Sequence, residues 1–149
     1  MNRRRSRPST VAIVAAAVGA VLLIVSPFLV WGKVEADLGI LSATVSSTGI
    51  DSGYGWITVA LGLAVAGLGI AWWIGLPRVA AVSGWLVLAV GAAALSVYEL
   101  TQVRDCALDL FDECVATPTF GPGLFVALAG AAVTVVAAVS AWVKPRTTA

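Results

Sequence analysis

The side chains with the greatest capacity for chemistry are two cysteines and eight acidic residues, all of which fall in two short segments of the chain. Residues 32–55 hold Glu35, Asp37 and Asp51, and residues 99–121 hold both cysteines and the other five acids. The chain has no histidine, which removes the usual general base near neutral pH and the commonest metal ligand. We therefore expect no catalytic site, no metal site and no cofactor, and we predict that the protein is not an enzyme.

The two cysteines favour a structural bond over redox catalysis. Cys106 and Cys114 lie in the same segment, and we predict a disulfide between them if that segment is outside the cytoplasm, where disulfides persist. Closing so short a loop stabilises it by roughly 2–3 kcal/mol in the chain-entropy model. Four-helix membrane enzymes that generate disulfides pass electrons between two cysteine pairs and a quinone. One pair is too few for that relay.

The acids beside the cysteines allow two interpretations. Asp105, Asp109 and Asp112 are neighbours at helical spacing, and oxygen ligands suit calcium. Their spacing is not that of an EF-hand loop. The alternative is a solvated acidic surface with Leu108 and Phe111 facing the membrane or the helices.

Hydropathy dominates the rest of the sequence. The chain is 60% hydrophobic and 11% charged, with a mean hydropathy of +0.98. Soluble domains average about 45–50% apolar residues and about 25% charged residues. Four apolar stretches without Asp, Glu, Lys or Arg are each about long enough to cross a hydrocarbon core: Val11–Trp31, Trp56–Leu76, Val79–Tyr98 and Pro122–Val143. We predict a single all-α membrane domain over residues 1–149, a four-transmembrane-helix bundle with two short extracytoplasmic loops.

The basic residues predict the orientation. Seven lie before the first span, between spans two and three, or after the fourth: Arg3, Arg4, Arg5, Arg7, Arg78, Lys144 and Arg146. The opposite side holds Lys33 and Arg104. Cytoplasmic loops carry the excess of Lys and Arg, so we expect a multi-pass protein of the bacterial cytoplasmic membrane with both termini in the cytoplasm. The basic start also resembles a signal peptide, but its apolar run is too long and contains Pro27 and Trp31.

Small and aromatic residues predict how the spans pack. Between helices in lipid, small side chains let the backbones approach, and we assign helix packing to Gly62, Ala66, Gly84, Gly123, Ala127, Gly130 and Ala131. Tryptophan prefers the headgroup depth, and we assign interface positions to Trp31, Trp56, Trp72, Trp73 and Trp142. Trp85 lies deeper and is expected to pack against a neighbouring helix. Glu99, at the outer end of span three, is the acid nearest to the membrane interior.

The first outer segment alternates in a way that is typical of strands. Val34–Leu38 and Leu41–Ser46 alternate and are separated by Asp37-Leu38-Gly39, which predicts a short β-hairpin. The segment ends in Thr48-Gly49-Ile50-Asp51-Ser52-Gly53-Tyr54-Gly55-Trp56.

This last motif resembles small four-span actinobacterial membrane proteins that lack an assigned activity, in which a Gly-Asp-rich outer loop ends in Gly-Trp before a helix. The resemblance implies no catalytic residues. Our leading hypothesis is a non-enzymatic accessory, assembly or scaffold subunit of the bacterial cell envelope. Its expected partners are the lipid bilayer and another membrane protein or a second copy, and not nucleic acid. The alternative is a small oligomeric transporter or channel.

Overall fold

The computed structural model describes the backbone of residues 9–37, 42–102, 109–110, 113–114 and 116–143. Its main elements are four helices, α1 (Thr10–Val25), α2 (Gly55–Ile74), α3 (Arg78–Gln102) and α4 (Pro122–Trp142). Each is long and apolar enough to cross a membrane, counting a 3₁₀ turn (η1, Ser26–Phe28) with α1. The helices lie where the hydropathy of the sequence predicts four spans.

The fold is mostly helical, as predicted, but the segments predicted as outer loops also form a sheet. Strand β1 (Val30–Asp37) pairs antiparallel with β2 (Ser42–Thr48) on one side and with β5 (Ala116–Phe120) on the other. The predicted hairpin is confirmed as β1–β2, and its turn lies outside the described residues. Strand β5 was not predicted, because its sequence, Ala-Thr-Pro-Thr-Phe, contains a proline and shows little alternation.

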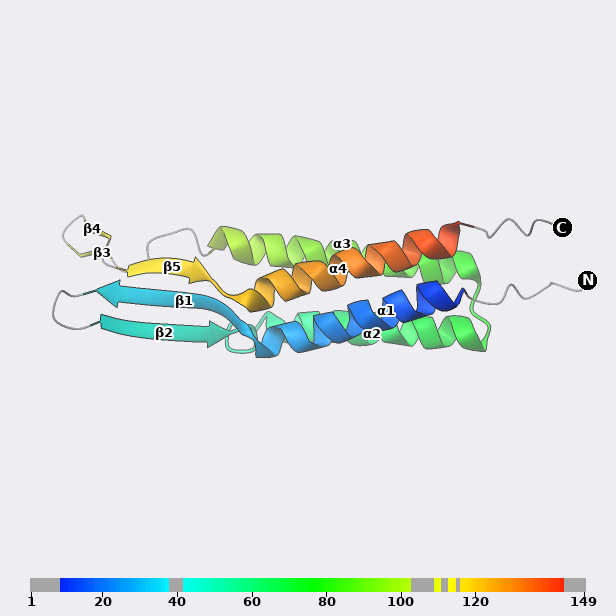
Figure 1. The fold of residues 1–149 in the computed structure, drawn as a ribbon, viewed down its shortest axis with the longest axis horizontal. Coiled ribbons are helices and arrows are strands. Elements are labelled where there is room, and N and C mark those ends of the chain that lie inside the picture. Colours follow the sequence, from blue (N-terminus) through cyan, green and yellow to red (C-terminus); the bar gives the residue numbers. More distant parts are fainter. Residues whose placement is uncertain (1–8, 38–41, 103–108, 111–112, 115, 144–149) are drawn as a thin grey trace, which may run out of the picture.

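The sheet extends from one end of the helical bundle (Figure 1). Helix α1 packs against α2 and α4, and α3 packs against the same two helices. The start of α1, the end of α4 and the α2–α3 turn lie together at the end of the bundle away from the sheet. The two segments predicted as outer loops therefore share one end of the molecule.

Helix α1 begins and ends at residues with clear local causes. Ser9 caps its start, since the Ser9 side chain accepts a hydrogen bond of 3.1 Å from the Ala12 N–H. Pro27 has no N–H to donate and cannot continue an α-helix, so the chain tightens into η1 and then becomes strand β1. The predicted end of this span at Trp31 was therefore too late.

The α2–α3 connection is a tight hairpin. Gly75 ends α2 with a φ of 135°, a conformation that favours glycine. Pro77 precedes α3, and the Arg78 guanidinium donates a hydrogen bond to the Ala141 carbonyl in the last turn of α4. That contact ties the turn to the fourth helix.

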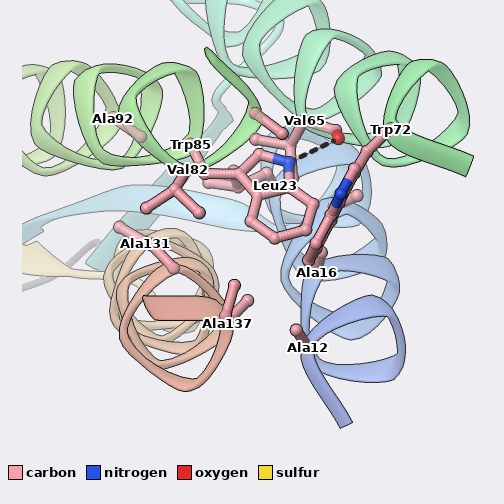
Figure 2. Packing of buried hydrophobic residues seen from close by; sticks show 14 residues of the cluster. Ala12, Ala16, Leu23, Val65, Trp72, Val82, Trp85, Ala92, Ala131 and Ala137 are labelled. Atoms are coloured by element: carbon pink, nitrogen blue, oxygen red, sulfur yellow. Dashed lines mark hydrogen bonds between the residues drawn. The ribbon is translucent and has the colours of Figure 1, made fainter. Parts of the chain in front are cut away.

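Trp85 fills the centre of the bundle (Figure 2). Its side chain is fully buried, its indole N–H donates to the Val65 carbonyl of α2 at 3.1 Å, and its ring meets Trp72 edge to face at 5.6 Å between centroids. The expectation that Trp85 packs against a neighbouring helix is confirmed. Trp72 was predicted to lie at the membrane interface, but it is 5% exposed and its ring faces the core, in edge-to-face contact with Trp85.

Glycines mark the closest helix crossings. A Cβ on Gly19 of α1 would collide with the Thr134 hydroxyl and lie 3.0 Å from the Gly130 carbonyl oxygen, both on α4. A Cβ on Gly62 of α2 would lie 2.9 Å from the Ala20 carbonyl oxygen of α1. These contacts leave no room for a side chain, which is the small-residue packing expected between helices in lipid.

The outward faces of the helices are apolar. Large side chains such as Val11, Ile70, Trp73 and Val87 are more than half exposed, and only 22% of the most apolar window of α2 is buried inside the protein. Soluble monomers rarely expose such continuous apolar surface. Hydrocarbon is the solvent that suits it.

We predict that Gly19→Ala lowers the free energy of unfolding by about 1–3 kcal/mol, because the added methyl group overpacks the α1–α4 crossing. The matched control is Gly91→Ala on α3, where a Cβ would meet no atom within 4 Å and the change is expected to be neutral or slightly stabilising. Thermal unfolding in detergent measures both. Equal midpoints for the two variants would contradict the crossing.

Candidate functional site

The sheet joins the bundle around Trp31, which we treat as the centre of the candidate site. A β-bulge between Val30 and Gly32 sets Trp31 out of register with β2. Its side chain is 4% exposed, and its indole N–H donates to the Ser26 carbonyl at 2.7 Å. The prediction that Trp31 lies at the lipid interface is therefore wrong, because the bulge directs the ring into the protein.

Glycines make room for the Trp31 ring. A Cβ on Gly123, in the first turn of α4, would collide with the indole and lie 2.8 Å from the Ser26 carbonyl oxygen. A Cβ on Gly49, just after β2, would collide with the six-membered part of the ring, whereas Gly123 faces the Cδ1–Nε1 edge. The ring is thus held between the end of β2 and the start of α4. We call Trp31, Gly49 and Gly123 the tryptophan lock.

Backbone hydrogen bonds reinforce the tryptophan lock. The Gly121 N–H donates to the Trp31 carbonyl at 2.8 Å, and the Ile50 N–H donates to the Pro27 carbonyl at 3.2 Å. Gly121 is also the N-cap of α4 and is followed by Pro122, a residue suited to the first helical position. The three chain segments that connect the sheet to the bundle near η1 are therefore hydrogen-bonded to one another: the start of β1 to the segment before α4, and η1 to the segment after β2.

The turn after β2 is closed by a charged group. Asp51 Oδ2 accepts the Thr48 backbone N–H at 2.9 Å and the Thr48 hydroxyl at 2.7 Å. The backbone hydrogen bond first, and the hydroxyl second, hold the pKa of Asp51 below its ordinary value. The ionised Asp51 carboxylate thus fixes the end of β2, at Thr48, close to the start of α2.

Glu99 is the buried acid of this region. It lies in the last turns of α3 and is 9% exposed, and its Oε1 atom has no hydrogen-bond partner among the described residues. Next to it in the chain, Tyr98 meets Tyr54 edge to face at 6.0 Å between centroids. A buried carboxylate oxygen without a partner is costly, so Glu99 is an unusual feature of the outer end of the bundle.

The other predicted aromatic residues lie on the surface. Trp56, Trp73 and Trp142 are all exposed. Trp56 is at the sheet end of α2, whereas Trp73 and Trp142 are in the last turns of α2 and α4, at the opposite end.

The predicted packing residues lie at several different contacts. Gly62, Gly123, Ala127, Gly130 and Ala131 are buried, and Ala66 and Gly84 are partly buried. Gly123 contacts the tryptophan lock, and a Cβ on Gly84 would collide with Leu68 of α2. The structure therefore does not gather them on one face.

An apolar groove opens between α1 and α2 near the end of the bundle away from the sheet. It has a volume of about 420 Å³ and is lined by Ile13, Ala16, Ala17, Val65, Ala66, Gly69, Ile70 and Trp73. Apart from the indole N–H of Trp73, no side chain of this lining can form a hydrogen bond. The groove is suited mainly to apolar contact.

The cysteines and the acidic segment contribute nothing further to the described site. Cys106, Asp105 and Asp112 lie outside the described residues, so the predicted Cys106–Cys114 disulfide stays a prediction. Asp109–Leu110 (β3) and Glu113–Cys114 (β4) pair as two short antiparallel strands, so helical spacing does not apply at Asp109. Within the described part of the chain, no three potential metal-ligating side chains come together.

Comparison with known proteins adds no family: no family model matches the chain, and no curated protein matches it.

The tryptophan lock was missed by reasoning from the sequence. Gly123 was assigned to helix packing and Trp31 to the lipid interface, on the assumption that α1 continues to residue 31. The signal that could have revealed the lock is Pro27, which ends α1 early, followed by the alternating residues of β1.

We predict that Trp31→Phe destabilises the protein by about 1–3 kcal/mol, because it removes the indole hydrogen bond to the Ser26 carbonyl, which keeps only the Leu29 N–H, and leaves part of the ring's space empty. The matched control is Trp56→Phe, whose side chain is exposed and whose loss should change stability by less than about 0.5 kcal/mol. Unfolding in detergent, followed by tryptophan fluorescence, compares the two. Equal stability of both variants would argue against the lock.

We predict that Glu99→Met raises the free energy of unfolding by about 1–3 kcal/mol, because an unpaired buried oxygen is replaced by an apolar side chain of similar length. The control is Glu35→Met on β1, where the acid is exposed. A clear loss of stability in Glu99→Met would contradict the unpartnered state of this carboxylate.

Proposed function

We propose that the protein is a non-enzymatic scaffold or assembly subunit of the bacterial cytoplasmic membrane, which holds a small sheet rigidly outside the membrane for a protein partner. The observation that carries the proposal is the tryptophan lock. It fixes the three-stranded sheet to the bundle at β1, at the end of β2 and at the start of α4. A rigid platform suits recognition, because little ordering entropy is lost when a partner binds it.

The orientation in this proposal rests on charge. Arg78 lies at the end of the bundle away from the sheet, where α1 begins and α4 ends. In the sequence, the other basic residues of the predicted cytoplasmic side directly precede α1 or follow α4. The excess of Lys and Arg on cytoplasmic segments then puts the sheet on the extracytoplasmic side.

The bundle interior supports a structural function more than transport. Trp85, Trp72 and Val65 fill its centre. The buried hydroxyls of Ser96 and Thr134 bond to carbonyls four residues back in their own helices, which is the ordinary way for helices to satisfy such groups. A transport pathway would have to form between several copies.

We predict that the tagged full-length chain, extracted from native membranes in mild detergent, migrates on native gels as a complex with a second, defined protein. Trp31→Ala should lose that complex while the chain stays in the membrane, because the sheet is no longer fixed. Trp56→Ala is the matched control and should retain it. Recovery of the wild-type chain as a monomer would contradict the proposal. Solute flux through the purified protein in proteoliposomes would instead support the alternative function, a small oligomeric transporter or channel.

A further inference from the structure

The two edges of the sheet differ in a way that bears on the partner. The strand order is β2-β1-β5, so β2 and β5 each leave one edge without a neighbouring strand among the described residues. Unpaired edges invite another strand, and proteins usually protect them with Pro, Lys or a bulge. Strand β2 has no Pro, no Lys and no charge in Ser42–Thr48, and the bulge in its ladder lies on β1 and not on β2.

The pairing register shows which backbone groups face the open edges. Pro118 of β5 is opposite Val34 of β1. Because Pro118 has no N–H, this pair must be of the non-hydrogen-bonded kind, so Val34 directs its N–H and C=O toward β2. Val34 is opposite Val45 there, and Val45 bonds inward.

The neighbours of Val45 consequently direct their backbone groups outward. Alternation along an antiparallel strand turns the N–H and C=O groups of Thr44 and Ser46 to the free edge of β2. The Thr48 N–H points to the same side as those of Thr44 and Ser46, and it donates to Asp51, which is not part of the sheet. The groups left at the free edge are therefore those of Thr44 and Ser46, and Asp51 covers the end of this edge that is nearer to the bundle.

A second copy of the chain does not fit this edge. Strands β2 and β5 both run antiparallel to β1, so both run toward the bundle. Two copies inserted in the same sense and at the same depth hold their β2 strands parallel and set Thr44 opposite Thr44, with the backbone groups of both facing the partner. A parallel ladder needs directly opposite residues to turn these groups to opposite sides, and an antiparallel β2–β2 ladder would need one copy inverted. A β2–β5 ladder between copies would meet Pro118, whose missing N–H lies at the middle of the free β5 edge.

We propose that the free edge of β2 binds an extended segment of a different extracytoplasmic polypeptide as a fourth strand. This inference rests on the proposed scaffold function and names its kind of partner. Backbone hydrogen bonds from Thr44 and Ser46 supply the affinity, as in other cases of strand addition. Val45 is 67% exposed on one face and the hydroxyls of Thr44 and Ser46 lie on the other, so the segment carries an apolar residue flanked by polar ones.

The test places a photo-crosslinking amino acid at residues 44, 45 and 46 in turn, in the full chain in native membranes. The expected products join these positions to consecutive residues of one segment of another protein, because paired strands keep register. Crosslinks to β2 or β5 of a second copy, crosslinks scattered over unrelated positions, or no crosslinks overturn the proposal.

Edge variants test the backbone directly. Ser46→Pro removes an outward N–H, and Thr44→Pro does the same independently; each is expected to reduce the crosslink from residue 45 about tenfold, the effect of about 1.4 kcal/mol. Ser46→Ala keeps the N–H and should retain the crosslink. Unchanged melting of the proline variants shows that they fold, and equal crosslinking in folded proline and alanine variants overturns the proposal.

A crosslinker at exposed Val87 of α3 separates this inference from the proposed function. Capture of a defined partner from residue 87 but not from β2 would agree with the proposed scaffold function and would overturn strand addition. Capture from neither site contradicts both.

Discussion

The structure depends on the burial of one indole ring where a helix gives way to a strand. Trp31 lies between Gly49 and Gly123, and its N–H donates to the Ser26 carbonyl, which also accepts the Leu29 N–H at 3.2 Å. One such buried hydrogen bond contributes about 0.5–1.5 kcal/mol, to which the close packing of the ring adds. The same ring thus contacts the end of α1, packs against the first turn of α4 and fixes the sheet to both, so fold and proposed function share one contact.

A second constraint is the solvent. The helices are held together by close backbone approach at Gly19, Gly62 and Gly130 and by the Trp85 hydrogen bond to α2. Their outer faces keep large apolar side chains exposed. In hydrocarbon this division is favourable, because packing and hydrogen bonding hold helices together while lipid covers the rest. The bundle can therefore be rigid without a large hydrophobic core.

Hydropathy predicted the four helices because span length and the lack of charge are properties of each segment alone. Alternation predicted the β1–β2 hairpin for the same local reason. The positions of Trp31 and Trp72 could not be predicted in this way: both were assigned to the interface from their distance along an assumed helix. Trp31 is turned inward by a bulge and Trp72 by its contact with Trp85, and β5 is a strand only because β1 is beside it. These are long-range contacts that no local pattern contains.

The most direct test of the account is the distance between the sheet and the bundle. Spin labels would be carried on unnatural amino acids at Val45 of β2 and Phe125 of α4, both of which are exposed. The distance between the two labels would be measured by pulsed electron paramagnetic resonance in lipid nanodiscs. The account predicts a single narrow distance distribution that broadens in Trp31→Ala and not in Trp56→Ala. A broad distribution in the wild-type protein would contradict a sheet fixed to the bundle.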